Sequence, residues 1–375
     1  MIILEKNSIK TKIEKRISED IACGKVGGAA VLVKQNGEVV YKGFFGTDGK
    51  QREITDQTLF RLASMTKPIT AIATLKEIEK GRLSLDSTVA EFIPGYAEMD
   101  IGDLDENGEI IIIGKAKTKI TIRHLLSHTS GIGSGKLAGK EDKLTTAAQT
   151  DLKSITDAYA DLPLSFEPFT AQAYSATLGF DILARIVEIV SGKSYDKYLK
   201  EEIFEPLGMY DTTFAPTDEQ WDRMILMHSY KEGIASFAPL KRNTIFAGQP
   251  LTYFCGGAGL ASTLADYEKF VDMLSSRGKK ANGEQFIPSE LIDLMATPTS
   301  PVEFYKGETW GLSVRVITGK ENRIPQGSFG WSGAYGCHFW VDPTNNITAI
   351  YMKNSTYDGG SSAKTGQNLE RDVYS

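Results

Sequence analysis

Residues 61–70 read RLASMTKPIT, and this short segment places a serine, Ser64, three positions before a lysine, Lys67. On a helix, residues three apart lie on the same face, so the Lys67 amine can reach the Ser64 hydroxyl. Pro68 lacks an N–H and is tolerated only in a first helical turn, which places the start of the helix near Ser64. A serine hydroxyl is a poor nucleophile until a neighbouring group takes its proton. The segment therefore predicts a serine with an adjacent base at the positive end of a helix, where free backbone N–H groups can hold an oxyanion.

The Ser-x-x-Lys spacing alone is weak evidence, because the chain contains it four times, as Ser64/Lys67, Ser194/Lys197, Ser276/Lys279 and Ser361/Lys364. Ser194 and Ser276 lie among charged and polar residues. Ser361 lies in the small, polar stretch STYDGGSSAKTGQ (355–367), which we expect to be a loose tail. Only Ser64 opens an apolar helix, so it is the candidate nucleophile. A capping serine followed by a solvated lysine is the alternative that the spacing leaves open.

Length and composition restrict the possible partners. The chain has 375 residues, more than one hydrophobic core usually supports, so we expect two lobes or one domain with a large insertion. A net charge of −6 gives no reason to expect nucleic acid or an anionic membrane as a partner. No segment approaches the roughly 18 apolar residues of a membrane span. The N-terminal segment MIILEKNSIKTKIEKR lacks the apolar run of a signal peptide, which predicts a cytoplasmic protein unless an export signal has been removed.

Local patterns predict where the first helices and strands lie. Isoleucines recur every four positions from Ser8 to Ile21, which is typical of an amphipathic helix. The segment AAVLVKQNGEVVYKGFFG consists of two β-rich runs around Asn36-Gly37, a strong signal for a hairpin. Residues 66–81 and 177–192 have helical patterns, and each ends in a glycine.

Strand signals return near the C-terminus, in WGLSVRVI (310–317), GWSGAYGCHFWVDP (330–343) and ITAIYMKN (347–354). Because strands that follow one another tend to be neighbours, the hairpin and these segments predict one mainly antiparallel sheet. The fold class is therefore α+β, an α/β sandwich formed by residues 1–75 and 290–375 with an all-helical lobe, residues 76–289, inserted into it. We expect the functional site in the cleft between the two parts.

The residues around Ser64, FRLASMTKPITA, resemble the nucleophile segment of the serine β-lactamase and penicillin-binding-protein superfamily. Further stretches resemble its class C β-lactamase and family VIII carboxylesterase branch: LSLDSTVAEFIPGY (83–96), ITIRHLLSHTSGI (120–132), IFEPLGMYDTTF (203–214) and GGAGLASTLADYEKF (256–270). The similarity runs in order from about residue 20 to 355. It implies the fold already predicted from the local patterns, an antiparallel sheet flanked by helices with a helical lobe inserted.

The resemblance also implies a Tyr-x-Asn motif, in which the tyrosine works with the lysine in proton transfer. The matching positions here are Tyr174, Ser175 and Ala176. The tyrosine is present, and the asparagine is replaced by Ala176. In β-lactamases this asparagine hydrogen-bonds the substrate amide and the active-site lysine, and a methyl group can do neither.

A third element implied by the resemblance is a Lys-Thr-Gly triad on the strand beside the site, whose lysine helps to bind the β-lactam carboxylate. A literal KTG begins at Lys364, but no β-rich run surrounds it, so we interpret it as a chance match. The better match is Trp331-Ser332-Gly333, which is similar to the Trp-x-Gly of family VIII esterases. Glycine lets a substrate approach the backbone closely. The resemblance then assigns the second oxyanion donor to the N–H of Ala334, beside that of Ser64.

Both departures from the β-lactamase pattern favour an ester over a β-lactam. They remove an amide-binding asparagine and a carboxylate-binding lysine, while Trp331 provides an apolar wall. The resemblance therefore implies a serine hydrolase with an acyl-enzyme, in which Ser64, Lys67 and Tyr174 are catalytic and Ala176 and Trp331-Ser332-Gly333 meet a small ester or amide substrate. A class C-type β-lactamase or D-amino-acid peptidase is one alternative, and a non-catalytic binding or sensor protein is another.

No cofactor or metal is expected. Residues 103–108 match the opening of an EF-hand loop, but position twelve is Gly114 and isoleucines follow, so we predict a turn between two strands. His124 and His128 lack the glutamate of a zinc helix and are interpreted as packing residues. The three cysteines are far apart, which predicts reduced thiols. Whether Tyr335 or His338 faces the cleft, and the oligomeric state, are left open by the sequence.

Overall fold

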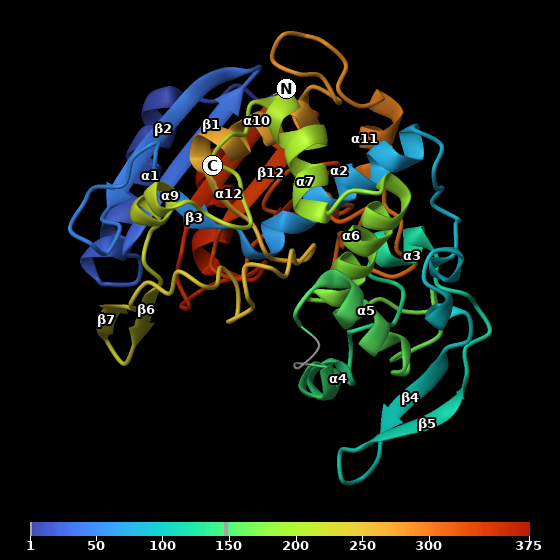
Figure 1. The fold of residues 1–375 in the computed structure, drawn as a ribbon. Helices are drawn as coiled ribbons and strands as arrows, with labels where there is room; N and C mark the ends of the chain where they lie inside the picture. The colour runs from blue at the N-terminus through green and yellow to red at the C-terminus, as the bar shows by residue number, and fades with distance from the viewer. Residues whose placement is uncertain (1, 146–148) are drawn as a thin grey trace.

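The computed structural model describes residues 2–145 and 149–375. Residues 146–148, which fall within the predicted inserted lobe, and Met1 lie outside the described residues. One large sheet and a mainly helical region beside it make up the described parts of the chain (Figure 1).

The large sheet is antiparallel and has seven strands in the order β2-β1-β13-β12-β11-β10-β9. Its strands are β1 (Gly28–Gln35), β2 (Glu38–Gly46), β9 (Glu308–Trp310), β10 (Arg315–Ile317), β11 (Phe329–Ser332), β12 (His338–Asp342) and β13 (Ile347–Lys353). The N-terminal hairpin thus pairs with the last strand of the chain, as predicted. Asn36 and Gly37 both have positive φ at the hairpin turn, at 52° and 79°, which is the conformation that an Asn-Gly turn provides.

Two of the three predicted C-terminal strands are each divided in the structure. The segment 310–317 is split into β9 and β10 by a turn in which Gly311 N–H donates to Val314 O and Ser313 has a φ of 75°. The segment 330–343 is split into β11 and β12 by a turn at Gly336, whose φ is 94°. In both places apolar composition continued through the turn, so composition alone did not reveal it.

Both faces of the sheet are covered, because alternate residues of the strands β1, β12 and β13 belong to different cores. On β1, Ala30 and Leu32 join the main core, whereas Val31 and Val33 join a smaller one. The smaller core lies under α1 (Lys6–Ala22) and α12 (Lys364–Tyr374), and the main core includes α2 (Thr66–Glu79) and α10 (Leu264–Ser275). Helix α1 buries Ile9, Ile13 and Ile17, as its four-residue period predicted, although it begins before Ser8.

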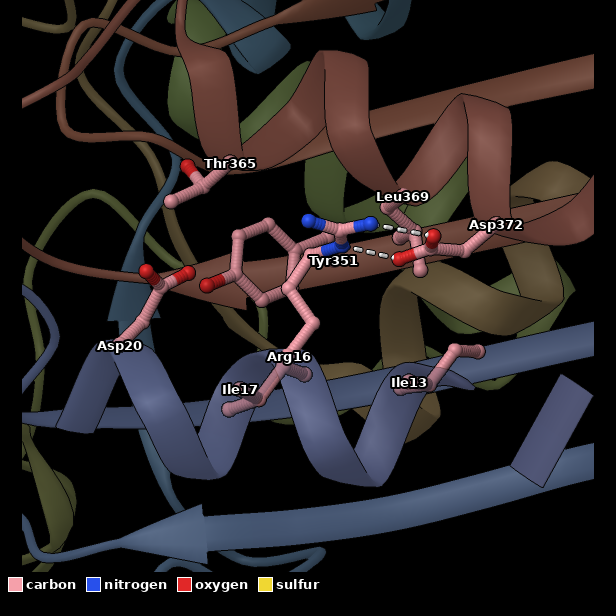
Figure 2. Close-up of a pocket in the computed structure, with 8 residues that line it drawn as sticks. All are labelled: Ile13, Arg16, Ile17, Asp20, Tyr351, Thr365, Leu369 and Asp372. Carbon is pink, nitrogen blue, oxygen red and sulfur yellow. Dashed lines mark hydrogen bonds and ion pairs between the residues drawn. The ribbon is translucent and has the colours of Figure 1, made fainter. Parts of the chain in front are cut away.

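The C-terminal segment is not the loose tail that its composition suggested. Residues 364–374 form α12, which packs beside α1 (Figure 2). The helix buries Leu369 and Val373. Arg16 of α1 forms an ion pair with Asp372, with Nη2 2.6 Å from Oδ1. Residues 364–374 have the amphipathic pattern of a helix that buries one face, and the small, polar residues before them connect β13 to this helix.

The rest of the chain is mainly helical. Its helices are α3 (Ile122–Leu126), α4 (Ala138–Thr145), α5 (Leu152–Ala160), α6 (Leu178–Ser191), α7 (Tyr195–Leu199), α8 (Glu205–Leu207), α9 (Asp218–Arg223) and α11 (Ser289–Met295). Short helical turns are η1 (Ala63–Met65), η2 (Val89–Glu91), η3 (Pro94–Tyr96) and η5 (Lys200–Phe204). Helix α6 ends at Gly192 in the left-handed conformation, as predicted.

The predicted all-helical lobe also contains short strand pairs. These are β4 (Asp100–Leu104) with β5 (Ile110–Lys115), β6 (His228–Lys231) with β7 (Ile234–Phe237), and β8 (Ala261–Thr263) with β3 (Leu59–Arg61). The β4–β5 pair confirms the predicted turn between strands at the EF-hand-like segment. Helix α10 lies within residues 76–289, yet it packs on strands β1, β12 and β13 of the large sheet. The division into residues 1–75 with 290–375 and residues 76–289 stays a prediction.

Two further findings concern the membrane and the cysteines. None of the helices among the described residues is both long and apolar enough to cross a membrane. Cys23 is exposed, Cys255 and Cys337 are buried, and all three are free thiols.

The packing of α12 generates a prediction about stability. Leu369→Ala should lower the free energy of unfolding by about 2–4 kcal/mol, because it leaves a cavity against α1 and the sheet. The exposed neighbour Arg371→Ala should change the free energy of unfolding by less than about 0.5 kcal/mol. Urea denaturation followed by tryptophan fluorescence measures both. If Leu369→Ala changed the free energy of unfolding as little as Arg371→Ala does, the result would contradict the packing of α12.

Candidate active site

The nucleophile candidate, Ser64, lies at a strained turn between a strand and a helix. Strand β3 ends at Arg61, η1 follows at Ala63–Met65, and α2 begins at Thr66. Ala63 has a φ of 46°, an unusual value for a residue with a side chain, and such strain is often found at functional sites. Pro68 falls in the first turn of α2, as the sequence predicted, and Ser64 is 8% exposed.

Strand β11 approaches this turn so closely that only glycine fits at its end. A Cβ on Gly333 would lie 2.2 Å from the carbonyl oxygen of Leu62. The absence of a side chain at Gly333 therefore brings the Trp331-Ser332-Gly333 segment against η1. The two halves of the site, far apart in sequence, meet at this backbone contact.

Lys67 extends from α2 into the protein interior, where it is fully buried. Its Nζ lies 3.3 Å from Ser64 Oγ. The same nitrogen donates to two backbone carbonyl oxygens, at 2.5 Å to Ala176 and 2.8 Å to Gly257. A neutral amine has two N–H groups and one lone pair, so the two carbonyls satisfy both donors and leave the lone pair for the Ser64 hydroxyl. The geometry can accommodate Lys67 as a base.

Ala176 contributes to the site through its backbone. Its side chain is exposed and is not among the residues that line the cleft beside Ser64, and its predicted contact with a substrate stays a prediction. Its backbone carbonyl instead binds Lys67, which is one of the contacts that the replaced asparagine makes in β-lactamases. The loss of the asparagine side chain therefore does not remove the anchoring of the lysine.

Tyr174 lies in the cleft wall but does not bind Lys67 through its hydroxyl group in this structure. Lys67 Nζ lies over the Tyr174 ring, 4.8 Å from its centroid. The Tyr174 hydroxyl accepts a hydrogen bond of 3.4 Å from Trp331 Nε1. His128 and Trp310 pack against the same ring, with centroid distances of 4.7 and 5.8 Å.

Ala334 follows the close approach of Gly333 and lines the cleft together with Ser64. Its N–H has no hydrogen-bond acceptor among the residues that the structure describes. An unpaired N–H beside a nucleophile can stabilise the oxyanion that forms when an ester carbonyl is attacked. The position of Ala334 is therefore compatible with the predicted oxyanion hole.

The cleft beside Ser64 has a volume of about 460 Å³ and carries no charged side chain among its described lining residues. Its aromatic wall consists of Tyr174, Phe304, Tyr305, Trp310 and Trp331. Facing polar residues include Gln172, Ser332, Ser361 and Ser362. Trp331 lines this cleft, whereas Lys364 of the literal KTG begins α12, is exposed and lies outside the lining set.

Neither of the two undecided side chains lines this cleft. His338 is buried on β12, with Nδ1 2.7 Å from Ser332 Oγ and Nε2 3.1 Å from Glu370. Burial opposes ionisation of Glu370, but Arg315 and His338 hold its pKa below the usual range. His338 Nε2–H therefore donates to the Glu370 carboxylate, and Nδ1 is hydrogen-bonded to the Ser332 hydroxyl. Tyr335 contacts Phe246 instead, with ring centroids 5.7 Å apart.

Several residues near the site carried no usable signal in the sequence. Gln172, Phe304 and Trp310 reach the cleft from separate loops and strands, and residues 360–362 come from the segment predicted to be a tail. His128 is fully buried, and burial together with the charge of Lys67 lowers its pKa well below 6.5. His128 has the packing role that was predicted, and one of the rings it packs against is Tyr174 in the cleft wall.

The remaining histidine and metal predictions concern other parts of the structure. His124 Nδ1 accepts from Thr121 N–H in a capping box at the start of α3. No group of three or more His, Cys, Asp or Glu side chains among the described residues is arranged to hold a metal ion.

Comparison with known proteins gives similar relatives along nearly the whole chain. Esterase EstB of Burkholderia gladioli is 27% identical over 392 residues, covering 96% of this chain and 94% of that protein. A putative D-alanyl-D-alanine carboxypeptidase of Escherichia coli K12 is 24% identical over 378 residues, covering 92% and 82%.

Solved structures share the fold. EstCE1, described as a hydrolase with promiscuous acyltransferase activity, superposes with a TM-score of 0.82 at 22% identity over 99% of both chains. An octameric penicillin-binding protein homologue from Pyrococcus abyssi gives a TM-score of 0.72 at 25% identity, covering 95% of this chain and 75% of the other. The family model described as Beta-lactamase matches residues 13–371. The chain therefore belongs to the beta-lactamase family, whose members are serine hydrolases, and the resemblance predicted from its motifs is confirmed.

Proposed function

We propose that this protein is a carboxylesterase that acts on neutral esters of small to medium size through an acyl-enzyme on Ser64. The observation that carries the proposal is the contrast between the two sides of Ser64. A buried amine lies 3.3 Å behind the hydroxyl, and the cleft in front of it is aromatic and free of charged side chains among the described residues. Such a cleft suits an uncharged ester better than a substrate with a carboxylate.

Acylation begins with transfer of the Ser64 hydroxyl proton to Lys67 as Ser64 Oγ bonds to the ester carbonyl carbon. The backbone N–H groups of Ser64 and Ala334 stabilise the negative charge on the carbonyl oxygen. The bond to the alcohol then breaks, and Tyr174 gives the leaving alkoxide a proton. Lys67 is the first proton acceptor because its amine contacts Ser64 Oγ directly. Tyr174 can share the deprotonation of Ser64, as predicted, only if the Tyr174 hydroxyl turns from Trp331 toward Ser64.

Deacylation returns the enzyme to its starting state. After acylation Lys67 is protonated and Tyr174 is a phenolate. A water molecule loses a proton to Tyr174 and attacks the acyl carbon, and the ester bond to Ser64 breaks as Lys67 returns its proton to Oγ. No step requires a metal or cofactor. The carboxylic acid and the alcohol are both neutral or readily solvated products that can leave through the open cleft.

Two rival functions are compatible with the family. A β-lactamase or D-amino-acid peptidase is supported by the similarity to a putative D-alanyl-D-alanine carboxypeptidase. Against it, the strand position that holds a carboxylate-binding lysine in β-lactamases is Trp331 here. A non-catalytic binding or sensor protein is the other rival, and the contact between Lys67 and Ser64 argues against it.

The identity of the nucleophile can be tested by covalent labelling. A fluorophosphonate should label the wild-type protein rapidly, and Ser64→Ala should abolish labelling because it removes the attacking oxygen. Ser194→Ala is the matched control, since Ser194 also precedes a lysine by three residues but lies at the start of α7, and it should label normally. Labelling or ester hydrolysis that survives in Ser64→Ala would exclude Ser64 as the nucleophile.

Substrate preference can be tested with two esters of similar shape. The value of kcat/KM for 4-nitrophenyl butyrate should exceed that for mono-4-nitrophenyl succinate, which carries a carboxylate, by at least about tenfold because the cleft has no charged side chain to pair with it. A chromogenic cephalosporin should react more slowly still. A much larger kcat/KM on the cephalosporin would replace the esterase proposal by the β-lactamase alternative.

A further inference from the structure

Helix α6 carries a buried carboxylate, Asp181, which lies close to the amine of Lys67 on α2. Asp181 is fully buried, and it forms no ion pair with any residue in the described parts of the chain. The Tyr253 hydroxyl donates to Oδ2, and the Gly256 N–H donates to Oδ1 at 2.8 Å. A buried carboxylate is tolerated only when such donors satisfy it. Asp181 therefore fixes the segment 253–257 through hydrogen bonds to its members.

The same segment provides one of the two carbonyls that hold Lys67. Gly257 O accepts from Lys67 Nζ at 2.8 Å. On the other side, Gly256 O accepts from Thr70 Oγ1 at 2.6 Å. A Cβ on Gly256 would lie 2.3 Å from Phe180 O, so the segment packs against α6 without room to shift. Asp181 and Thr70 thus both hold Gly256, the residue before the carbonyl that binds Lys67.

Asp181 is also the negative charge that faces Lys67. Burial raises the pKa of Asp181 to about 6, while hydrogen bonds from Tyr253, Cys255 and Gly256 and the charge of Lys67 oppose this effect. The carboxylate is therefore mainly ionised above neutral pH. A nearby negative charge favours the protonated form of an amine.

The other titratable groups around the pair are neutral in this pH range. Burial raises the pKa values of Tyr253, Cys255 and Tyr195 above their ordinary values, so these groups keep their protons. Burial also raises the pKa of Tyr96, which senses the charge of Asp181 from η3. Burial lowers the pKa of His128 well below 6.5, so it remains uncharged beside Lys67.

We propose that Asp181 is a positioning residue for the Lys67 base: it holds the Gly257 carbonyl against the amine, and its charge sets the pH range in which the amine can accept the Ser64 proton. This rests on the proposed role of Lys67, but not on the choice of substrate. Asp181 acts through Gly257 and through its charge, and it touches neither Ser64 nor the cleft.

The test follows the rate of fluorophosphonate labelling of Ser64 between pH 5 and 9, in wild type and variants. At the acidic end of the profile the labelling rate falls as the Lys67 base becomes protonated; this part of the curve is called the acid limb. Asp181→Asn keeps the shape of the side chain and removes its charge, so the acid limb should move to lower pH by roughly 0.5–1 unit. Thr70→Val removes the hydrogen bond to Gly256 without a change of charge. It should lower the plateau rate severalfold to about tenfold and leave the acid limb where it is.

Asp157→Asn, an exposed carboxylate on α5 paired with Lys153, is the matched control and should leave the whole profile unchanged. If Asp181→Asn does not fold, Tyr253→Phe replaces it. Loss of this donor makes the carboxylate harder to ionise and should move the acid limb in the same direction by a smaller amount.

An acid limb that stays in place in the folded Asp181→Asn variant, or in Tyr253→Phe, would overturn the proposal, even if the variant were less stable. An unchanged plateau in Thr70→Val would overturn the positioning part. Absence of labelling in the wild type would overturn the proposed function and this inference together. Labelling without ester turnover would overturn only the proposed function, because the pH profile would still be measured on Ser64.

Discussion

The amine of Lys67 is fully buried, so its hydrogen bonds must come from protein groups rather than from water. The rest of the site depends on this constraint. An isolated buried ammonium group is costly, and a buried amine without partners loses its hydrogen bonds as well. The carbonyls of Ala176 and Gly257 and the hydroxyl of Ser64 supply three partners in three directions. The two carbonyls come from segments more than 100 residues away from Lys67 on the chain, so these segments must pack against α2 before the base is held. The fold and the chemistry of the site are linked at this nitrogen.

The same constraint explains how the chain can lack the asparagine of its β-lactamase relatives and still hold its lysine. A backbone carbonyl at Ala176 makes the contact, and no side chain is needed there. On the substrate side, Trp331 lines the cleft at the position that the motif resemblance matches to the carboxylate-binding lysine. Trp331 packs against Trp310 with centroids 4.5 Å apart and against Tyr174 at 5.4 Å. The contact between Lys67 and Ser64 together with this aromatic wall is the basis of the proposed preference for an ester.

Much of the fold was predictable because its signals are local. The isoleucine period of α1, the Asn36-Gly37 turn and the glycine that ends α6 each act over a few residues, and all three are confirmed. The turns that divide β9 from β10 and β11 from β12 were missed, since apolar residues continue through them. Helix α12 was missed because its stability depends on α1 and on the ion pair between Arg16 and Asp372, which only the folded chain brings together.

The site shows the same division between local and distant information. Ser64, Lys67 and Trp331 belong to short motifs, and the structure places all three within one region. Asp181, Phe304 and the 360–362 segment belong to no recognisable motif and reach the site through tertiary packing. The carbonyl of Gly257 could not be predicted at all, because a backbone oxygen has no signature in the sequence.

The central claim is that Ser64 carries the acyl group during turnover. It is tested most directly by mixing the enzyme with 4-nitrophenyl butyrate, quenching in acid within the first turnovers, and measuring the mass of the intact protein and of its peptides. The account predicts a protein heavier by one butyryl group, with the added mass on the peptide that contains Ser64. Hydrolysis of the ester with no adduct under conditions in which deacylation limits the rate, or an adduct on another residue, would contradict it.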